Sequence, residues 1–321
     1  MIVVTGAAGF IGSVLVNSLN DAGQTDLILV DTLGNQDKWK NLRAKKFIKL
    51  ITPDELLAEL VADEISPTAI LHIGALTDTG EKDADLTNRQ NTEYTRNVAH
   101  WAIKHDVRFI YASSASVYGN GDYGFSDDDD LTPKLLPMNP YAYSKWLFDA
   151  RAIAEGWSEK FVGLRFFNVF GPNEYHKARM ASVVWHAFNQ IKNTGGIELF
   201  QSHKDGYTDG GQTRDFIYVK DICNVILWFL DHPEANGVFN LGTGNARTFN
   251  DLAAAIFSAL KTEPKVQFVP TPEQFRKSYQ YFTEADLTKL RSIGCDYKFS
   301  TLEESVADYI NGYLEKDNPY V

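Results

Sequence analysis

The chain alternates short apolar runs with longer stretches in which apolar residues recur at helical spacing. Ile11, Val14, Leu15 and Leu19 share one helical face, for example, and residues 56–61 and 84–105 are further helix candidates. Five runs rich in Ile, Val, Leu and Phe indicate buried strands at residues 2–5, 27–31, 69–73, 108–113 and 161–167. Strands that alternate with helices are typical of βαβ units, so the pattern predicts a parallel sheet covered on both faces.

After about residue 170 the pattern is less regular. It indicates helices near 177–193, 219–231, 249–260 and 301–315, and strands at 197–200 and 237–241. We therefore predict an α/β fold, with a Rossmann-type doubly wound parallel sheet in residues 1–170. Residues 171–321 are expected to form mainly a smaller C-terminal α/β lobe for the substrate, with some segments returning to the first domain.

Composition narrows the class of protein. The net charge of −11 comes without any basic block, so we expect no nucleic-acid partner. Cys223 and Cys295 are far apart and lack metal-ligand spacing, so neither a metal site nor a disulfide framework is expected. The N-terminus has no positively charged leader and no apolar run reaches membrane-spanning length, which favours a cytoplasmic protein with no membrane contact. The acidic run 126–130 is expected to be a solvated loop.

Three glycines mark the turn between the first strand and the first helix. Gly6, Gly9 and Gly12 permit a tight turn and a close approach of the backbone to a pyrophosphate, which the helix N-terminus attracts. Asp31 ends the second strand at the spacing expected for a carboxylate that binds a ribose. This carboxylate favours NAD, whereas Lys38 could neutralise the 2′-phosphate of NADP. The residues alone leave that choice open.

A tyrosine and a lysine follow at the spacing of one helical turn. Asn139 can cap a helix that begins at Pro140, which places Tyr141 and Lys145 on one face. An ammonium group beside a phenol favours the phenolate, so we expect a lowered pKa for Tyr141 and a base that works near neutral pH. Ser114, at the end of the strand 108–113, could hold the reacting oxygen of a substrate. Together these features indicate an enzyme that moves a hydride between a nicotinamide cofactor and a small polar substrate.

In this order, the three features resemble the extended short-chain dehydrogenase/reductase superfamily, whose members mostly act on nucleotide-linked sugars. The likeness runs over nearly the whole chain and includes the segments 165–172, 213–221 and 239–253. Residues 174–186 and 279–290 are similar to segments of the ADP-glycero-manno-heptose 6-epimerases. That resemblance implies inversion at C6″ through a transient ketone, in the supply of heptose precursors for lipopolysaccharide. It also implies a homo-oligomer, a pentamer in the family.

The resemblance assigns roles to further residues. It implies that Tyr141 and Lys177 are the two acid/base groups, that Lys145 positions the nicotinamide ribose, and that Ser114 holds the C6″ oxygen. Implied cofactor contacts are Phe10, Ile11, Asp31, Thr32, Lys38, Asn91 and Val169, and the family favours NADP. Implied substrate contacts are Asn168, His186, Phe200, Arg214 and Tyr279. Arg179 stands where the family often has a small polar residue, and could add charge to a diphosphate pocket; the loop 201–213 is longer than expected.

Other functions remain open at this stage. A C4 epimerase would lack an equivalent of Lys177, and a 4,6-dehydratase would carry an acidic pair where this chain has Ala115 and Ser116. A net dehydrogenase would consume its cofactor at every turnover. A non-catalytic redox sensor would keep the glycine turn and usually lose the Tyr141–Lys145 pair.

Overall fold

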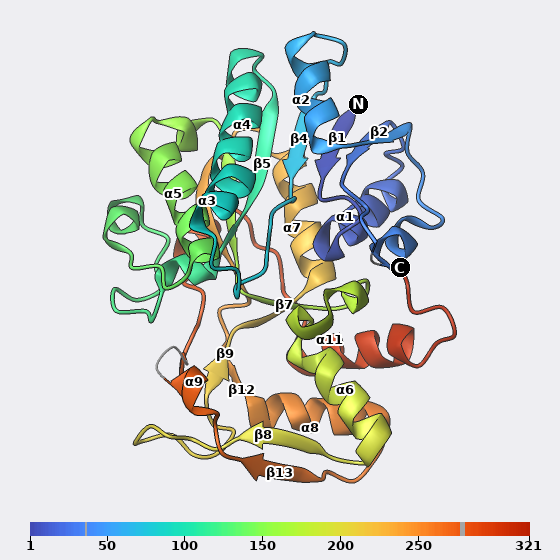
Figure 1. The fold of residues 1–321 in the computed structure, drawn as a ribbon, viewed down its shortest axis with the longest axis vertical. Helices are drawn as coiled ribbons and strands as arrows, with labels where there is room; N and C mark the ends of the chain where they lie inside the picture. Colours follow the sequence, from blue (N-terminus) through green and yellow to red (C-terminus); the bar gives the residue numbers. More distant parts are fainter. Residues whose placement is uncertain (36, 277–279) are drawn as a thin grey trace.

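The computed structural model describes residues 1–35, 37–276 and 280–321. Its centre is a seven-stranded parallel sheet in the order β11-β6-β5-β4-β1-β2-β3 (Figure 1). The strands are β1 Ile2–Thr5, β2 Leu27–Val30, β3 Lys49–Ile51, β4 Ala69–His72, β5 Arg108–Ser114, β6 Val162–Phe166 and β11 Gly237–Leu241. The predicted fold class is confirmed, and so are the five strands expected in the first half.

Helices cover both faces of this sheet. Neighbouring residues of a strand point to opposite faces: Val4 belongs to a core shared with α1 (Phe10–Asp21) and α7 (Val219–Asp231). Val3 belongs to the core shared with α2 (Pro53–Val61), α4 (Tyr94–Lys104) and α5 (Pro140–Ala154). Because the central strands are covered on both sides, most of their residues are apolar on both faces, and not only at alternate positions.

The helix expected over 84–105 is interrupted. α3 (Ala84–Thr87) passes into a π-helical segment, Asn88–Glu93, before α4 begins at Tyr94. Asn91 lies in this segment, and its side-chain amide bonds both the backbone of Leu76 and the hydroxyl of Ser144. Extra backbone in a helix of this kind re-aims side chains, and is frequent near functional sites.

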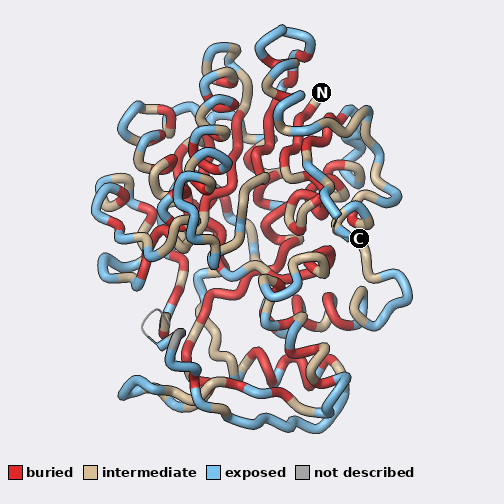
Figure 2. The backbone as a smooth tube through the Cα atoms, viewed as in Figure 1, coloured by how far each residue is buried: buried red, intermediate tan, exposed pale blue. Residues whose placement is uncertain are grey.

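The second half of the chain forms a lobe below the sheet and also returns to it (Figure 1). The lobe contains α6 (Val183–Thr194), α8 (Phe249–Leu260) and the parallel pair β8 (Ile197–Phe200) and β13 (Val266–Val269), whose outer face is exposed (Figure 2). Smaller elements are β7 Asn168–Phe170 paired with β10 Phe216–Tyr218, β9 Thr213–Arg214 paired with β12 Arg247–Thr248, α9 Glu273–Arg276, α10 Thr288–Ser292 and α11 Leu302–Tyr309. β11 and α7, which follow residue 170, belong to the central sheet and to the helices that cover it. The division of the chain into two domains near residue 170 stays a prediction.

The expectation of a solvated loop at 126–130 is wrong for part of the run: Asp128 and Asp130 are exposed, but Asp127 and Asp129 bind other elements. Asp127 is buried and accepts a hydrogen bond of 2.7 Å from the backbone N–H of Asn240. Asp129 begins a 3₁₀ turn, Asp129–Lys134, and forms a 2.7 Å ion pair with Lys289. The carboxylates therefore join this segment to β11 and α10, which the charge pattern alone could not indicate.

Among the described residues, no helix is both long and apolar enough to cross a membrane. No group of three or more His, Cys, Asp or Glu side chains among them could hold a metal ion.

Candidate active site

The glycine turn at the end of β1 is packed too closely for side chains. A Cβ on Gly12 would lie 2.1 Å from the carbonyl oxygen of Gly6, and one on Gly6 would lie 2.6 Å from the Cα of Gly74. Gly6 also has φ +64°, which L-residues with side chains rarely adopt. Helix α1 starts after Gly9 without a side-chain cap or an acidic residue in its first turn. Its first amides are therefore suited to a phosphate, and the turn fits a dinucleotide.

Asp31 and Lys38 are bound to each other. Asp31 follows β2, and one of its carboxylate oxygens accepts a 2.8 Å hydrogen bond from the backbone N–H of Ala8 in the glycine turn. The other lies 2.6 Å from Nζ of Lys38. Thr32, beside them, is exposed. A ribose that reaches Asp31 therefore also meets the ammonium group of Lys38.

A cavity of about 340 Å³ opens beside the glycine turn, at the carboxyl ends of the strands. Ligands of open α/β sheets bind at this edge. Eight of the residues singled out from the sequence line it: Phe10, Ile11, Ser114, Tyr141, Lys145, Asn168, Val169 and Lys177. They come from α1, β5, α5, β7 and the turn before α6, so the fold collects residues distant in sequence around one space.

Helix α5 presents Tyr141 and Lys145 to this cavity. Asn139 caps the helix by accepting a 2.8 Å hydrogen bond from the backbone N–H of Ala142, and Pro140 begins it, as expected. Nζ of Lys145 donates a 2.7 Å hydrogen bond to the carbonyl oxygen of Ala112 in β5. Burial lowers the pKa of Lys145 to about 8, and the charge of Asp149 acts in the opposite direction.

The pKa of Tyr141 differs from the sequence-based expectation. Burial raises it above its ordinary value, a hydrogen bond with Ser114 opposes that rise, and the charge of Asp149 adds to it. The expectation of a lowered pKa for Tyr141 is therefore wrong for this structure. The desolvation of Tyr141 outweighs its hydrogen bond with Ser114. Ser114 ends β5, and its Oγ also accepts a 2.9 Å hydrogen bond from the hydroxyl of Ser116.

Lys177 faces the same cavity from another part of the chain. It lies in the 3₁₀ turn Tyr175–Met180, and Nζ lies 6.0 Å from the centre of the Phe10 ring. Burial lowers the pKa of Lys177, and the neighbouring carboxylate of Glu174 opposes this. Glu174 is itself buried and accepts a 2.7 Å hydrogen bond from the hydroxyl of Ser182, the cap of α6. Glu174 thus joins this turn to the start of α6.

The other predicted substrate residues are not part of the cavity lining. Arg179 is exposed next to Met180, which does line the cavity, and its Nη2 contacts both carboxylate oxygens of Asp78 at 2.6 Å. His186 is on the exposed face of α6, with its ring against Trp185. Phe200 ends β8, and Arg214 in β9 donates hydrogen bonds to the carbonyl oxygens of Thr213 and Gln280. Tyr279 lies outside the described residues.

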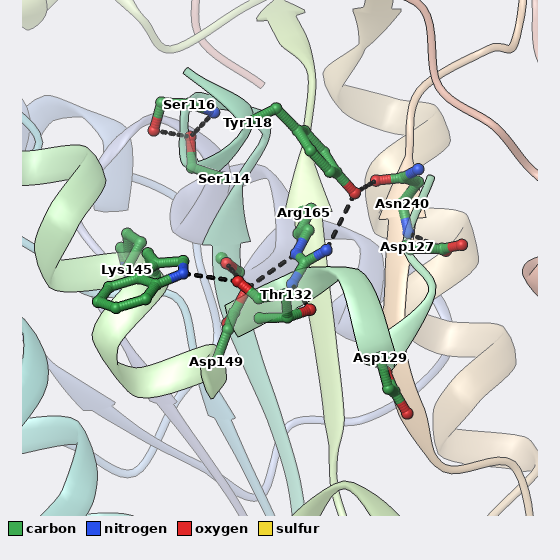
Figure 3. A network of polar contacts seen from close by, with 12 residues as sticks. Ser114, Ser116, Tyr118, Asp127, Asp129, Thr132, Lys145, Asp149, Arg165 and Asn240 are labelled. Atoms are coloured by element: carbon green, nitrogen blue, oxygen red, sulfur yellow. Dashed lines mark hydrogen bonds and ion pairs between the residues drawn. The ribbon is translucent and has the colours of Figure 1, made fainter. Parts of the chain in front are cut away.

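Several residues of the site were not foreseen. Thr77 and Thr79, in the segment after β4, and Met180 beside Lys177 line the cavity. Hydroxyl side chains just after a central strand were the available signal for the two threonines. Asp149 could have been found from its spacing, since it follows Lys145 by one helical turn. Figure 3 shows Asp149 meeting Arg165, whose guanidinium also donates to Tyr118 and Thr132.

Comparisons with known proteins agree with this geometry. A model of the NAD dependent epimerase/dehydratase family matches residues 2–242. The ADP-L-glycero-D-manno-heptose-6-epimerase of Nitratidesulfovibrio vulgaris (strain DP4) is 45% identical, with 100% of both chains covered. The protein of the same name from Fusobacterium nucleatum subsp. nucleatum is 42% identical, again with 100% of both chains covered.

Solved structures point the same way. The structure of Helicobacter pylori ADP-L-glycero-D-manno-heptose-6-epimerase is similar with a TM-score of 0.81 at 27% identity, covering 97% of this chain and 95% of that one. The complex of Thermus thermophilus UDP-glucose 4-epimerase with NAD has a TM-score of 0.74 at 25% identity, covering 97% of each chain.

Proposed function

The chain belongs to the NAD dependent epimerase/dehydratase family, and we propose that it inverts C6″ of ADP-glycero-manno-heptose. The observation that carries this proposal is the pairing of Tyr141 and Lys177, two groups able to move a proton, in one cavity. They reach it from α5 and from the turn Tyr175–Met180, which are separate elements. Full-length relatives named as heptose epimerases support the choice of sugar. Such a reaction serves the supply of heptose precursors for lipopolysaccharide.

The bound cofactor supplies the redox chemistry by accepting a hydride from C6″ and returning it. We propose that the glycine turn, Phe10, Ile11, Asp31, Thr32, Lys38 and Val169 hold this cofactor. Asn91 supports the cofactor site indirectly, because its side chain is already hydrogen-bonded to the backbone of Leu76 and to Ser144. We propose NADP rather than NAD, since Lys38 can pair with a 2′-phosphate if it leaves Asp31.

Two groups on separate elements suit an inversion. One takes the proton of the C6″ hydroxyl as the carbon becomes a ketone. The other returns a proton to the oxygen after the ketone has rotated to present its opposite face. Tyr141 and Lys177 take these roles, while Ser114 holds the oxygen and Lys145 positions the nicotinamide ribose. Asn168 contacts the sugar inside the cavity, and Arg214 and His186 contact the substrate only if the lobe moves toward it.

The substrate is tested by incubating the purified protein with ADP-D-glycero-β-D-manno-heptose, without added cofactor and then with NADP or NAD. Proton NMR follows the C6″ configuration, and absorbance follows any net reduction of the nicotinamide. We expect a mixture of the two C6″ epimers with no net absorbance change. Tyr141→Phe, which removes one hydroxyl, is expected to lower turnover about a hundredfold or more while the cofactor stays bound. A wild-type protein that binds cofactor but leaves the heptose unchanged would restrict the proposal to another nucleotide sugar.

We also propose a homo-oligomer, on the resemblance to the family alone. Light scattering of the purified protein measures its mass directly, and a mass of 36.0 kDa in solution would contradict the proposal.

A further inference from the structure

Asp149 and Arg165 form an ion pair that is buried between α5 and the sheet (Figure 3). Nε of Arg165 lies 2.9 Å from Oδ2 of Asp149, and both side chains have an exposed fraction of 0%. Asp149 also accepts hydrogen bonds from the hydroxyls of Tyr111, at 3.0 Å, and Ser113, at 2.8 Å. Removing two charges from water is costly, and well-packed apolar residues often serve stability as well or better. We therefore expect this buried ion pair to have a role beyond packing.

The position of Asp149 relates it to the site. It follows Lys145 by four residues, so the two side chains lie one turn apart on the same face of α5. Lys145 is bonded to the backbone of Ala112, and Asp149 is bonded to the side chain of Ser113. The next residue of β5 is Ser114, which bonds Tyr141. Two successive turns of α5 are thus attached to two successive residues of β5, which sets the register of Tyr141 against Ser114.

The charge of Asp149 also affects the pKa values of Lys145 and Tyr141. Burial lowers the pKa of Lys145 to about 8, and Asp149 is the charged group that opposes this. His72, which faces Lys145 from β4, is held neutral because burial lowers its pKa to about 3. Asp149 also raises the pKa of Tyr141, after the larger effects of burial and of Ser114. The guanidinium of Arg165 holds the carboxylate of Asp149 in place from β6.

We propose that Asp149, fixed by its ion pair with Arg165, is a positioning residue that places a buried negative charge one helical turn from Lys145 and holds α5 in register with Ser114. The part of this inference that concerns catalysis rests on the proposed function. The part that concerns the charge of Lys145 does not need any substrate.

The test therefore starts without substrate. Competitive acetylation of the full chain with acetic anhydride across a pH series, read by mass spectrometry at Lys145, reports the pKa of that amine. Asp149→Asn is expected to lower it by about one pH unit, because a buried negative charge one turn away is lost. The pH profile of turnover, on whichever nucleotide sugar the wild type accepts, is expected to shift toward acid by a similar amount.

Ser113→Ala is the matched control. It removes one hydrogen bond between α5 and β5 but leaves the charge, so it should lower turnover without moving the pKa of Lys145 by more than about a quarter of a unit. Asp149→Glu should keep that pKa at its wild-type value. If Asp149→Asn does not fold, the double variant Asp149→Asn/Arg165→Gln carries the test, since it leaves no unpaired buried charge.

An unchanged pKa of Lys145 in the folded Asp149 variant would overturn the inference and leave Asp149 a packing residue. Failure of the proposed function would show differently, as a wild type that does not turn over the heptose while the acetylation result stands.

Discussion

Arg179 forms an ion pair with Asp78 that joins two segments of the chain whose other residues line the cavity. Arg179 lies in the turn that carries Lys177, and Asp78 lies between Thr77 and Thr79. The two side chains are 67% and 40% exposed, so their ion pair contributes little to stability. It nevertheless joins two segments that line the cavity, and we expect its effect on the approach of the substrate rather than on folding.

Reversing one charge tests this residue pair. Arg179→Asp places two carboxylates together, and their repulsion should push the two segments apart. We expect kcat/KM to fall about fivefold, mainly through a higher KM, which corresponds to about 1 kcal/mol. The swapped variant Asp78→Arg/Arg179→Asp should recover most of the loss, with the same melting temperature as the wild type. If the swap recovers nothing, the guanidinium itself contacts the substrate, as the sequence suggested.

Among the elements, the sequence predicts best those whose burial is simple. β1, α7, α8, β8 and β11 have the predicted bounds, because each is an apolar run or a stripe with clear ends. β3 (Lys49–Ile51) was missed, since it is a half-buried edge strand with no apolar signature. β7 and β10 pair residues 168–170 with 216–218, a contact that no local pattern reports.

The candidate site shows the same division. The glycine turn and the start of α5 follow from local chemistry, and they were predicted. His186 was not brought to the cavity, because α6 buries Val184, Ala187, Phe188 and Ile191 and leaves His186 on the opposite face. Helical spacing alone could have shown this. The pairs Asp31–Lys38 and Arg179–Asp78 join separate segments and required the fold.

Asp127 gives a prediction for the segment before α5. Burial raises its pKa to about 6, so the folded protein holds this proton more tightly than the unfolded chain, whose value is 3.8. The folded state is then favoured below about pH 4 and loses stability as the pH rises toward 6. Asp127→Asn keeps an acceptor for the N–H of Asn240 and removes the charge.

We therefore expect Asp127→Asn to increase the free energy of unfolding by about 1–3 kcal/mol at pH 7.5. The gain should shrink as the pH falls from 6 to 4, in urea titrations that compare the variant with the wild type at each pH. A variant that is less stable at every pH would show that the ionised carboxylate is better solvated than its burial indicates.

At the scale of the whole molecule, one apolar core runs through both halves of the chain. It includes Val4 of β1 and Ile222 of α7, together with Ile197 of β8 and Phe257 of α8 in the lobe. A shared core ties the stability of the lobe to that of the sheet, so the two halves should not unfold separately.

We expect one unfolding transition, with the same midpoint by tryptophan fluorescence and by far-ultraviolet circular dichroism. Phe257→Ala, in the lobe, should lower both midpoints together and cost about 3–5 kcal/mol, because a fully buried ring is removed. Two separate transitions, with only one displaced by the substitution, would instead support independent domains divided near residue 170.

The place of β11 in the sheet has a consequence for how the protein is made. A ribosome releases β6 long before residues 237–241, so the nascent sheet carries an open edge beside β6 while α6, β8 and α7 are still being synthesised. Its unpaired N–H and C=O groups can recruit a strand from another chain during this interval. Slow translation between residues 166 and 237 should therefore lower the yield of folded protein, and a holding chaperone should restore it.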